Sequence, residues 1–175
     1  MPDMERKGAV TFKNNPITLI GPELKAGDKA PDFKALGKGL VEVSLADTKG
    51  KTRLISVVPS LDTPVCEVQT KRFNEEASKL PANVAVLTLS MDLPFAQSRF
   101  CGAQHADKIT TLSDHRDASF GKGYGVLIKE LRLLTRAVFI VGPDDKIQYA
   151  EYVKEVTSHP DYDKALNVLK TSSRV

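Results

Sequence analysis

The residues best suited to chemistry lie in the segment Pro59-Ser-Leu-Asp-Thr-Pro-Val-Cys66, which directly follows an apolar run at residues 54–58. The apolar run predicts a buried strand. Thr63 is a good helix N-cap residue and Pro64 suits the first helical position, so Cys66 should lie in the first turn of a helix. Unpaired backbone N–H groups and the positive end of the helix dipole favour a thiolate there. The sequence therefore predicts a nucleophilic cysteine at a strand–turn–helix junction.

A second interpretation treats Cys66 as a small buried hydrophobe, as most free cysteines are. Thr63 favours the functional interpretation, because a hydroxyl at the cap points into the same space and can hydrogen-bond a substrate oxygen. Cys101 is the only other cysteine and ends a short predicted helix, where it could be an ordinary core residue. If Cys66 is oxidised to a sulfenic acid, Cys101 is the only thiol of the same chain that can condense with it.

Arg136 stands immediately before an apolar run at residues 137–141. This position is typical of an edge residue whose guanidinium extends to solvent. The alternative is a guanidinium directed at the thiolate, where it would fix charge and hydrogen-bond an incoming oxygen.

Metal binding is the competing explanation for the cysteines, since Cys101 and His105 lie four positions apart on one helical face. A structural zinc site uses four closely spaced ligands, usually in C-x-x-C pairs. The chain has two cysteines and no such pair, so we expect no metal cofactor. The missing C-x-x-C also excludes a thioredoxin-type dithiol exchange site.

Composition limits the remaining classes of function. The 175 residues suffice for one domain, residues 1–175, with a real hydrophobic core. The net charge of +3 is dispersed along the chain, which argues against a nucleic-acid partner. No apolar run approaches the ~20 residues of a membrane span, and the N-terminus lacks the apolar stretch of a secretory signal. We therefore expect a cytoplasmic protein with no membrane partner.

Hydrophobic periodicity predicts strands that alternate with helices and end in a hairpin and a helix. Strands are expected at residues 10–13 and 17–20 (a hairpin), 41–45, 54–58, 84–89, 109–112, 137–141 and 147–153. Helices are expected at residues 64–80, 94–104 (ending near Gly102), 118–124 and 160–170, and an extended loop at residues 21–39. The helix at 64–80 should bury Val65, Val68, Phe73, Ala77 and Leu80. This order implies an α/β fold with a mixed central sheet and helices on both faces.

The chemically interesting residues resemble those of a known family. Pro59, Thr63 and Cys66 match the P-x-x-x-T-x-x-C active-site signature of the peroxiredoxins. The segment Asp92-Leu-Pro-Phe-Ala-Gln-Ser-Arg-Phe-Cys-Gly102 closely resembles the resolving-cysteine segment of the bacterial thiol peroxidases, the atypical two-cysteine subfamily. The segments Arg136-Ala-Val-Phe-Ile140 and Pro160-Asp-Tyr-x-x-Ala-Leu166 are also similar to that subfamily. The resemblance covers nearly the whole chain.

This resemblance implies a thioredoxin fold with an added N-terminal β-hairpin. Cys66 would be the peroxidatic cysteine and Cys101 the resolving cysteine, joined by an intramolecular disulfide on oxidation. Thr63 and Arg136 would be the polar partners of thiolate and peroxide, and Pro59 would shield the pocket. Thioredoxin would be the electron donor, a homodimer the assembly, and no cofactor would be needed.

The activity implied by the resemblance is thiol-specific reduction of hydrogen peroxide and organic hydroperoxides in antioxidant defence. One alternative is a thiol–disulfide oxidoreductase or chaperone on the same fold, which the missing C-x-x-C disfavours. Another is a peroxide sensor that passes its disulfide to a partner protein. Because Cys66 begins one helix and Cys101 ends another, we expect the two sulfurs to lie too far apart in the reduced protein for a disulfide. Oxidation would then require local unfolding of roughly residues 92–104.

Overall fold

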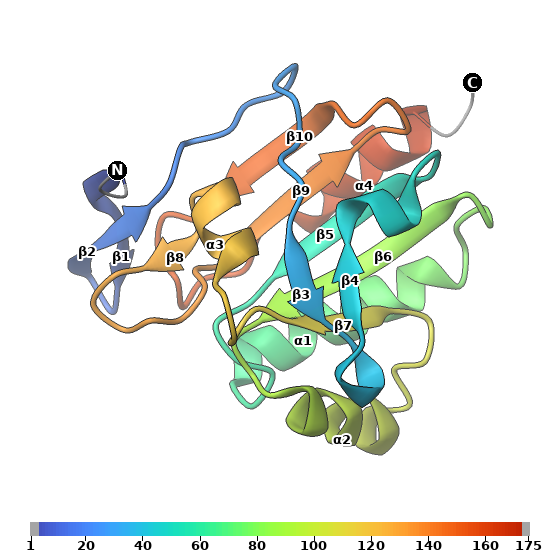
Figure 1. The fold of residues 1–175 in the computed structure, drawn as a ribbon, viewed down its shortest axis with the longest axis horizontal. Helices are drawn as coiled ribbons and strands as arrows, with labels where there is room; N and C mark the ends of the chain where they lie inside the picture. The colour runs from blue at the N-terminus through green and yellow to red at the C-terminus, as the bar shows by residue number, and fades with distance from the viewer. Residues whose placement is uncertain (1–3, 173–175) are drawn as a thin grey trace.

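The computed structural model describes residues 4–172, in which strands and helices alternate as predicted (Figure 1). A seven-stranded sheet forms the centre, with the spatial order β10 (Ile147–Tyr152), β9 (Ala137–Val141), β5 (Thr52–Val57), β6 (Val84–Ser90), β7 (Thr110–Ser113), β3 (Lys34–Leu36) and β4 (Glu42–Ser44). The strands β5, β6 and β7 run parallel to one another, and the outer strands pair antiparallel. The predicted mixed sheet is confirmed.

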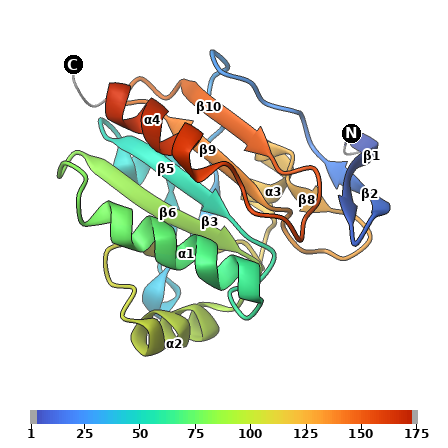
Figure 2. The ribbon, with the colours of Figure 1, turned by 180° about the vertical axis from the view of Figure 1, so that it is seen from behind.

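Helices cover both faces of this sheet, as expected from the order of strands and helices along the chain. The helices α1 (Pro64–Ala77) and α4 (Tyr162–Ser172) lie across one face, and α2 (Pro94–Gln104) lies near its β7 side (Figure 2). The short helix α3 (Ser119–Tyr124) lies on the other face. Within β9, Val138 and Ile140 belong to the core under α1 and α4, whereas Phe139 belongs to the core under α3. One strand therefore contributes side chains to both cores, because successive side chains of a strand point to opposite faces of the sheet.

The N-terminal hairpin is also confirmed, with β1 (Glu5–Phe12) and β2 (Asn15–Ile20) paired antiparallel. Lys13 and Asn14 form its turn with φ values of 50° and 69°, as a type I′ turn requires. A third strand, β8 (Leu127–Ile128), pairs with β2 and was not predicted, because two residues carry no periodicity.

The hairpin tip is tied to the loop that follows β10. The N–H of Thr11 donates to the Lys154 carbonyl (2.7 Å), and the N–H of Val156 donates to the Thr11 carbonyl (2.8 Å). The Glu155 carboxylate accepts from the N–H groups of Lys13 (3.1 Å) and Asn14 (2.8 Å). These bonds fix the tip beside the end of the central sheet that carries the candidate site.

Two predicted elements need correction. The stretch 21–39 is not wholly loop, because it contains β3 and a 3₁₀ turn at Lys38–Leu40. The helix α1 ends at Ala77, three residues early. The helix α2 covers the predicted range 94–104, and His105 supplies the left-handed residue that ends it, with φ of 54°.

The buried side of α1 agrees with the prediction in part, because Phe73 is buried and Ala77 and Leu80 pack against the core. Val68 is 50% exposed, whereas the helix buries Cys66, Gln69, Thr70 and Phe73. Apolar periodicity failed here because two polar side chains are satisfied internally. The Thr70 hydroxyl donates to the Cys66 carbonyl (2.8 Å), and the Gln69 amide donates to Ser56 Oγ (2.8 Å).

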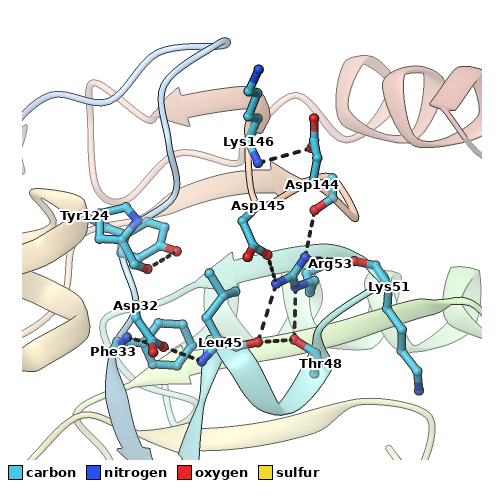
Figure 3. A network of polar contacts seen from close by, with 12 residues as sticks. Asp32, Phe33, Leu45, Thr48, Lys51, Arg53, Tyr124, Asp144, Asp145 and Lys146 are labelled. Carbon is cyan, nitrogen blue, oxygen red and sulfur yellow. Dashed lines mark hydrogen bonds and ion pairs between the residues drawn. The ribbon is translucent and has the colours of Figure 1, made fainter.

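A buried arginine secures the opposite end of β5 (Figure 3). The guanidinium of Arg53 donates to the carbonyls of Lys51 (2.9 Å) and Gly142 (2.7 Å), and to Thr48 Oγ1 (3.0 Å), and it pairs with Asp145. Removing a charge from water is tolerated only when partners satisfy it, and here they do. The network joins the start of β5 to the turn between β9 and β10, whereas Cys66 lies in α1, beyond the other end of the strand.

Candidate active site

Cys66 occupies the third position of α1, immediately beyond the carboxyl end of β5. Thr63 is the N-cap residue and Pro64 the first helical residue, which confirms the predicted strand–turn–helix junction. The cysteine side chain is fully buried. Thr63 caps by position only, because its hydroxyl donates to the Ser60 carbonyl (3.0 Å) rather than accepting from a helical N–H.

Arg136 is the residue immediately before β9, and β9 lies beside β5 in the sheet. Its Nη2 donates to Cys66 Sγ over 3.3 Å, and its Nε donates to the Val156 carbonyl over 2.7 Å. Only 2% of the arginine is exposed, so the solvent-edge interpretation of Arg136 is wrong. A guanidinium at this distance stabilises negative charge on sulfur and offers a donor to a bound oxygen.

Gln69 is part of this arrangement, and the sequence reasoning missed it. Its Oε1 accepts from Arg136 Nη1 (3.0 Å), and its own amide is anchored on Ser56 of β5. A polar residue three positions after Cys66, on the same side of the helix, was the available signal. The guanidinium therefore has three different acceptors, on Cys66, Gln69 and Val156, and these fix its plane.

A pocket of about 380 Å³ lies beside the Arg136 guanidinium. Its walls are mostly apolar and include Phe12 of the hairpin tip, Pro59 and Val156, whereas Thr63 and Arg136 supply polar groups. Cys66 does not line the pocket, and Arg136 connects it to the sulfur. The structure thus brings Pro59, Thr63 and Arg136 together, as the sequence predicted.

Cys101 lies elsewhere, in the last turn of α2. It borders a separate pocket of about 440 Å³ with Lys38 and Thr111, and both cysteines are free thiols. Burial raises the pKa of the Cys101 thiol, and a hydrogen bond with Thr111 opposes that rise. The Cys66 sulfur is bonded by Arg136, which lies at the start of β9, and the Cys101 sulfur by Thr111 of β7. The strands β5 and β6 lie between β9 and β7 in the sheet. At ~4.8 Å per strand spacing, those strands are ~14 Å apart.

A metal centre and a membrane-spanning helix are both absent from residues 4–172. That part of the chain holds no group of three or more His, Cys, Asp or Glu side chains arranged to bind a metal ion. None of its helices combines the length and apolar character needed to cross a membrane.

Comparison with known proteins identifies the family of this chain. Residues 25–166 match the family model described as Redoxin. A thiol peroxidase of Bacillus subtilis is 59% identical over 161 residues, which are 92% of this chain and 96% of the relative. A thiol peroxidase of Halalkalibacterium halodurans is 58% identical over 94% of this chain and 98% of its own.

Solved structures show the same fold. A peroxiredoxin-like protein from Aquifex aeolicus superposes with a TM-score of 0.88 at 44% identity, over 94% of this chain and 96% of its own. A thiol peroxidase from Chromobacterium violaceum, at 20% identity, has a TM-score of 0.83 over 94% of this chain and 97% of its own. The thioredoxin-type fold expected from the sequence is therefore confirmed. The chain belongs to the Redoxin family and, within it, to the bacterial thiol peroxidases.

Proposed function

We propose that Cys66 is the peroxidatic cysteine of this thiol-dependent peroxidase. The observation that carries the proposal is the hydrogen bond from Arg136 to Cys66 Sγ. The sulfur lies in the first turn of α1, and Arg136 also lines the pocket. In this assignment Arg136 and Thr63 bind the peroxide oxygens, and Pro59 keeps bulk water from the thiolate. Residues 1–175 act as one catalytic domain.

In the first step the Cys66 thiolate attacks one oxygen of the peroxide ROOH. An S–O bond forms, the O–O bond breaks, and RO⁻ takes a proton and leaves as an alcohol or water. Negative charge moves from sulfur onto the leaving oxygen, and the Arg136 guanidinium faces that movement from a fixed position. Because Val156 and Gln69 hold the guanidinium before peroxide arrives, little reorganisation is needed during the reaction.

In the second step Cys101 attacks the sulfur of the Cys66 sulfenic acid and releases water. The resulting disulfide closes a long loop, which constrains the unfolded chain by roughly 4 kcal/mol in the simple loop-entropy model. A thiolate of reduced thioredoxin then attacks the disulfide and restores both thiols. No metal or organic cofactor enters any of these steps.

The wider biological setting is part of the same proposal. Leu93 and Phe95, beside the Cys66 loop and at the start of α2, are 51% and 68% exposed. Exposed apolar side chains of this kind support a protein-binding surface, for a thioredoxin-type donor or for a second copy in a homodimer. We place the enzyme in the cytoplasm, where a thioredoxin system supplies electrons.

A coupled assay tests the proposal. The purified protein is mixed with hydrogen peroxide or an organic hydroperoxide, thioredoxin, thioredoxin reductase and NADPH, and NADPH oxidation is followed. We expect sustained turnover that needs every component. Consumption of only about one peroxide per chain, with the disulfide then passed to another protein, would favour the sensor alternative instead.

A further inference from the structure

The carboxylate of Asp92, which follows β6, accepts three hydrogen bonds that the steps above do not use. Its Oδ1 accepts from Ser60 Oγ (2.7 Å), and its Oδ2 accepts from the Leu61 N–H and from Ser90 Oγ (both 2.8 Å). Ser60 and Leu61 belong to the loop between β5 and α1, which leads directly to Cys66. The Asp92 carboxylate therefore holds the loop between β5 and α1, here called the Cys66 loop, although Asp92 itself follows a different strand.

Ser60 also bonds to Thr63, which we propose as a peroxide-binding residue. The Ser60 carbonyl accepts both the hydroxyl (3.0 Å) and the N–H (3.3 Å) of Thr63. Ser60 Oγ also accepts from the N–H of Asp62 (3.2 Å). Fixing Ser60 thus fixes the turn that orients Thr63 and begins α1.

The same carboxylate is connected to the helix that carries Cys101. Ser90, which donates to Asp92, accepts from the side-chain amide of Gln97 in α2 (3.0 Å). Gln97 is almost fully buried, and its amide also donates to the Leu112 carbonyl of β7 (2.8 Å). A continuous polar chain therefore runs from the Cys66 loop through Asp92 and Ser90 to α2.

We propose that Asp92 is a positioning residue that couples the Cys66 loop to the Cys101 helix. While its bonds are intact, the loop holds Thr63 and Cys66 for attack, and α2 holds Cys101 away from the reacting sulfur. When they break, the loop and α2 are released together and Cys101 reaches Cys66. This inference rests on the proposed roles of the two cysteines.

The coupling sets how the Cys66 sulfenic acid divides between two fates. In one, Cys101 attacks the sulfur, the S–O bond breaks and water leaves. In the other, the sulfenate attacks a second peroxide, whose O–O bond breaks, giving a sulfinic acid and an alcohol or water. A stronger connection delays the first fate and leaves more time for the second.

The test compares wild type with Asp92→Asn, whose amide carries no charge and one acceptor oxygen where the carboxylate has two. A bond to a charged acceptor is worth about a factor of ten or more, so we expect disulfide formation to accelerate about tenfold. The peroxide concentration that half-inactivates the enzyme should rise by a similar factor. Peroxide attack should slow about tenfold, because the loop is less fixed. Rapid quench with mass spectrometry measures the sulfinic acid and disulfide, and competition with a haem peroxidase measures attack.

Two further variants and a control make the result decisive. Ser60→Ala removes the bonds of Ser60 Oγ to Asp92 and from the Asp62 N–H, but it leaves the carboxylate and its bond from the Leu61 N–H. It should therefore shift both steps in the same directions by less, and it serves if Asp92→Asn fails to fold. Asp92→Glu, which restores the charge, should fall between wild type and Asp92→Asn. Asp107→Asn makes the same exchange at an exposed position after α2 and should match wild type.

The outcomes separate this inference from the proposed function. Opposite changes in attack and resolution, at a global stability that urea unfolding shows to be unchanged, support the coupling. Equal slowing of both steps, or an unchanged division between disulfide and sulfinic acid, overturns it. If the wild-type protein itself forms no Cys66–Cys101 disulfide, the proposed function fails, whatever the Asp92 variants do.

Discussion

Arg136 donates a hydrogen bond to Cys66 Sγ across 3.3 Å, although the two residues are 70 positions apart in the chain. The sheet makes this contact, because β5 leads into the loop before Cys66 and the neighbouring strand β9 begins directly after Arg136. A fixed cation and a helix N-terminus therefore converge on one buried sulfur. The following predictions test what this convergence does.

Replacing Cys66 by serine should abolish peroxide reduction and leave the fold intact. The hydroxyl occupies nearly the same volume, but it does not ionise at neutral pH and is a poor nucleophile without a base. Thioredoxin-coupled NADPH oxidation measures the loss, and circular dichroism with thermal unfolding checks the fold. Turnover close to wild type would remove Cys66 from the mechanism.

The Cys101→Ser variant should consume about one peroxide per chain and then stop. Without a second thiol the sulfenic acid on Cys66 persists, and excess peroxide converts it to sulfinic acid. Mass spectrometry should show one and then two added oxygens on the peptide that contains Cys66. Sustained thioredoxin-dependent cycling would mean that another group resolves the sulfenic acid.

Substituting Arg136 by methionine should slow peroxide attack about 100-fold, the usual cost of losing one preorganised donor to a developing oxyanion. Gln69→Leu should slow attack by a smaller factor, because the guanidinium stays but one of its acceptors is lost. Second-order rate constants from competition kinetics measure both effects. Arg116→Met, which removes a surface arginine paired with Glu42, is the matched control and should retain the wild-type rate. A wild-type rate in Arg136→Met would reassign Arg136 to a structural role.

Glu155 should make the anchoring of the hairpin tip dependent on pH. Hydrogen bonds from Thr157 first, and from Asn14 and Thr11, lower the pKa of its carboxyl from 4.5 to about 2. Since the folded-state pKa lies below the unfolded one, this stabilisation is present above about pH 4.5 and is lost as pH falls towards 2.

The variant Glu155→Gln should therefore be less stable than wild type at pH 7, and the difference should shrink steadily between pH 4.5 and pH 2. Urea unfolding at a series of pH values measures it. Glu75→Gln, at an exposed position of α1, is the control and should show no such pH-dependent difference. A stability gap that stays constant down to pH 2 would contradict the assignment.

Disulfide formation should unfold α2. The helix is short, Cys101 faces Thr111 on the β7 side, and the Cys66 sulfur is held on the β9 side. Hydrogen exchange should show weaker protection of residues 92–104 in the oxidised protein than in the reduced one. The parallel strands β5 and β6 should keep their protection in both forms and serve as the internal reference. Equal protection of 92–104 in both forms would defeat the idea.

The sequence by itself determined the local features of this protein. The junction at Cys66 was predictable because a buried strand, a cap residue and Pro64 act within a few positions of one another. The hairpin between β9 and β10 was predictable because Gly142 and its neighbours form a strong turn signal between two apolar runs. The mixed sheet and the two-sided helix layers followed from the order of such elements.

Only the tertiary structure decided which distant residues meet. Arg136, Gln69 and Cys66 converge because β9 lies beside β5, and strand order is not written in local periodicity. The same limit hid the polar side of α1, since a buried glutamine is stable only with partners from other elements. It also hid the contacts of Asp92, whose partners Ser60 and Leu61 lie in a loop about thirty residues away in the chain. Short-range rules govern caps, turns and periodicity, whereas contacts across the sheet depend on the packing of the whole chain.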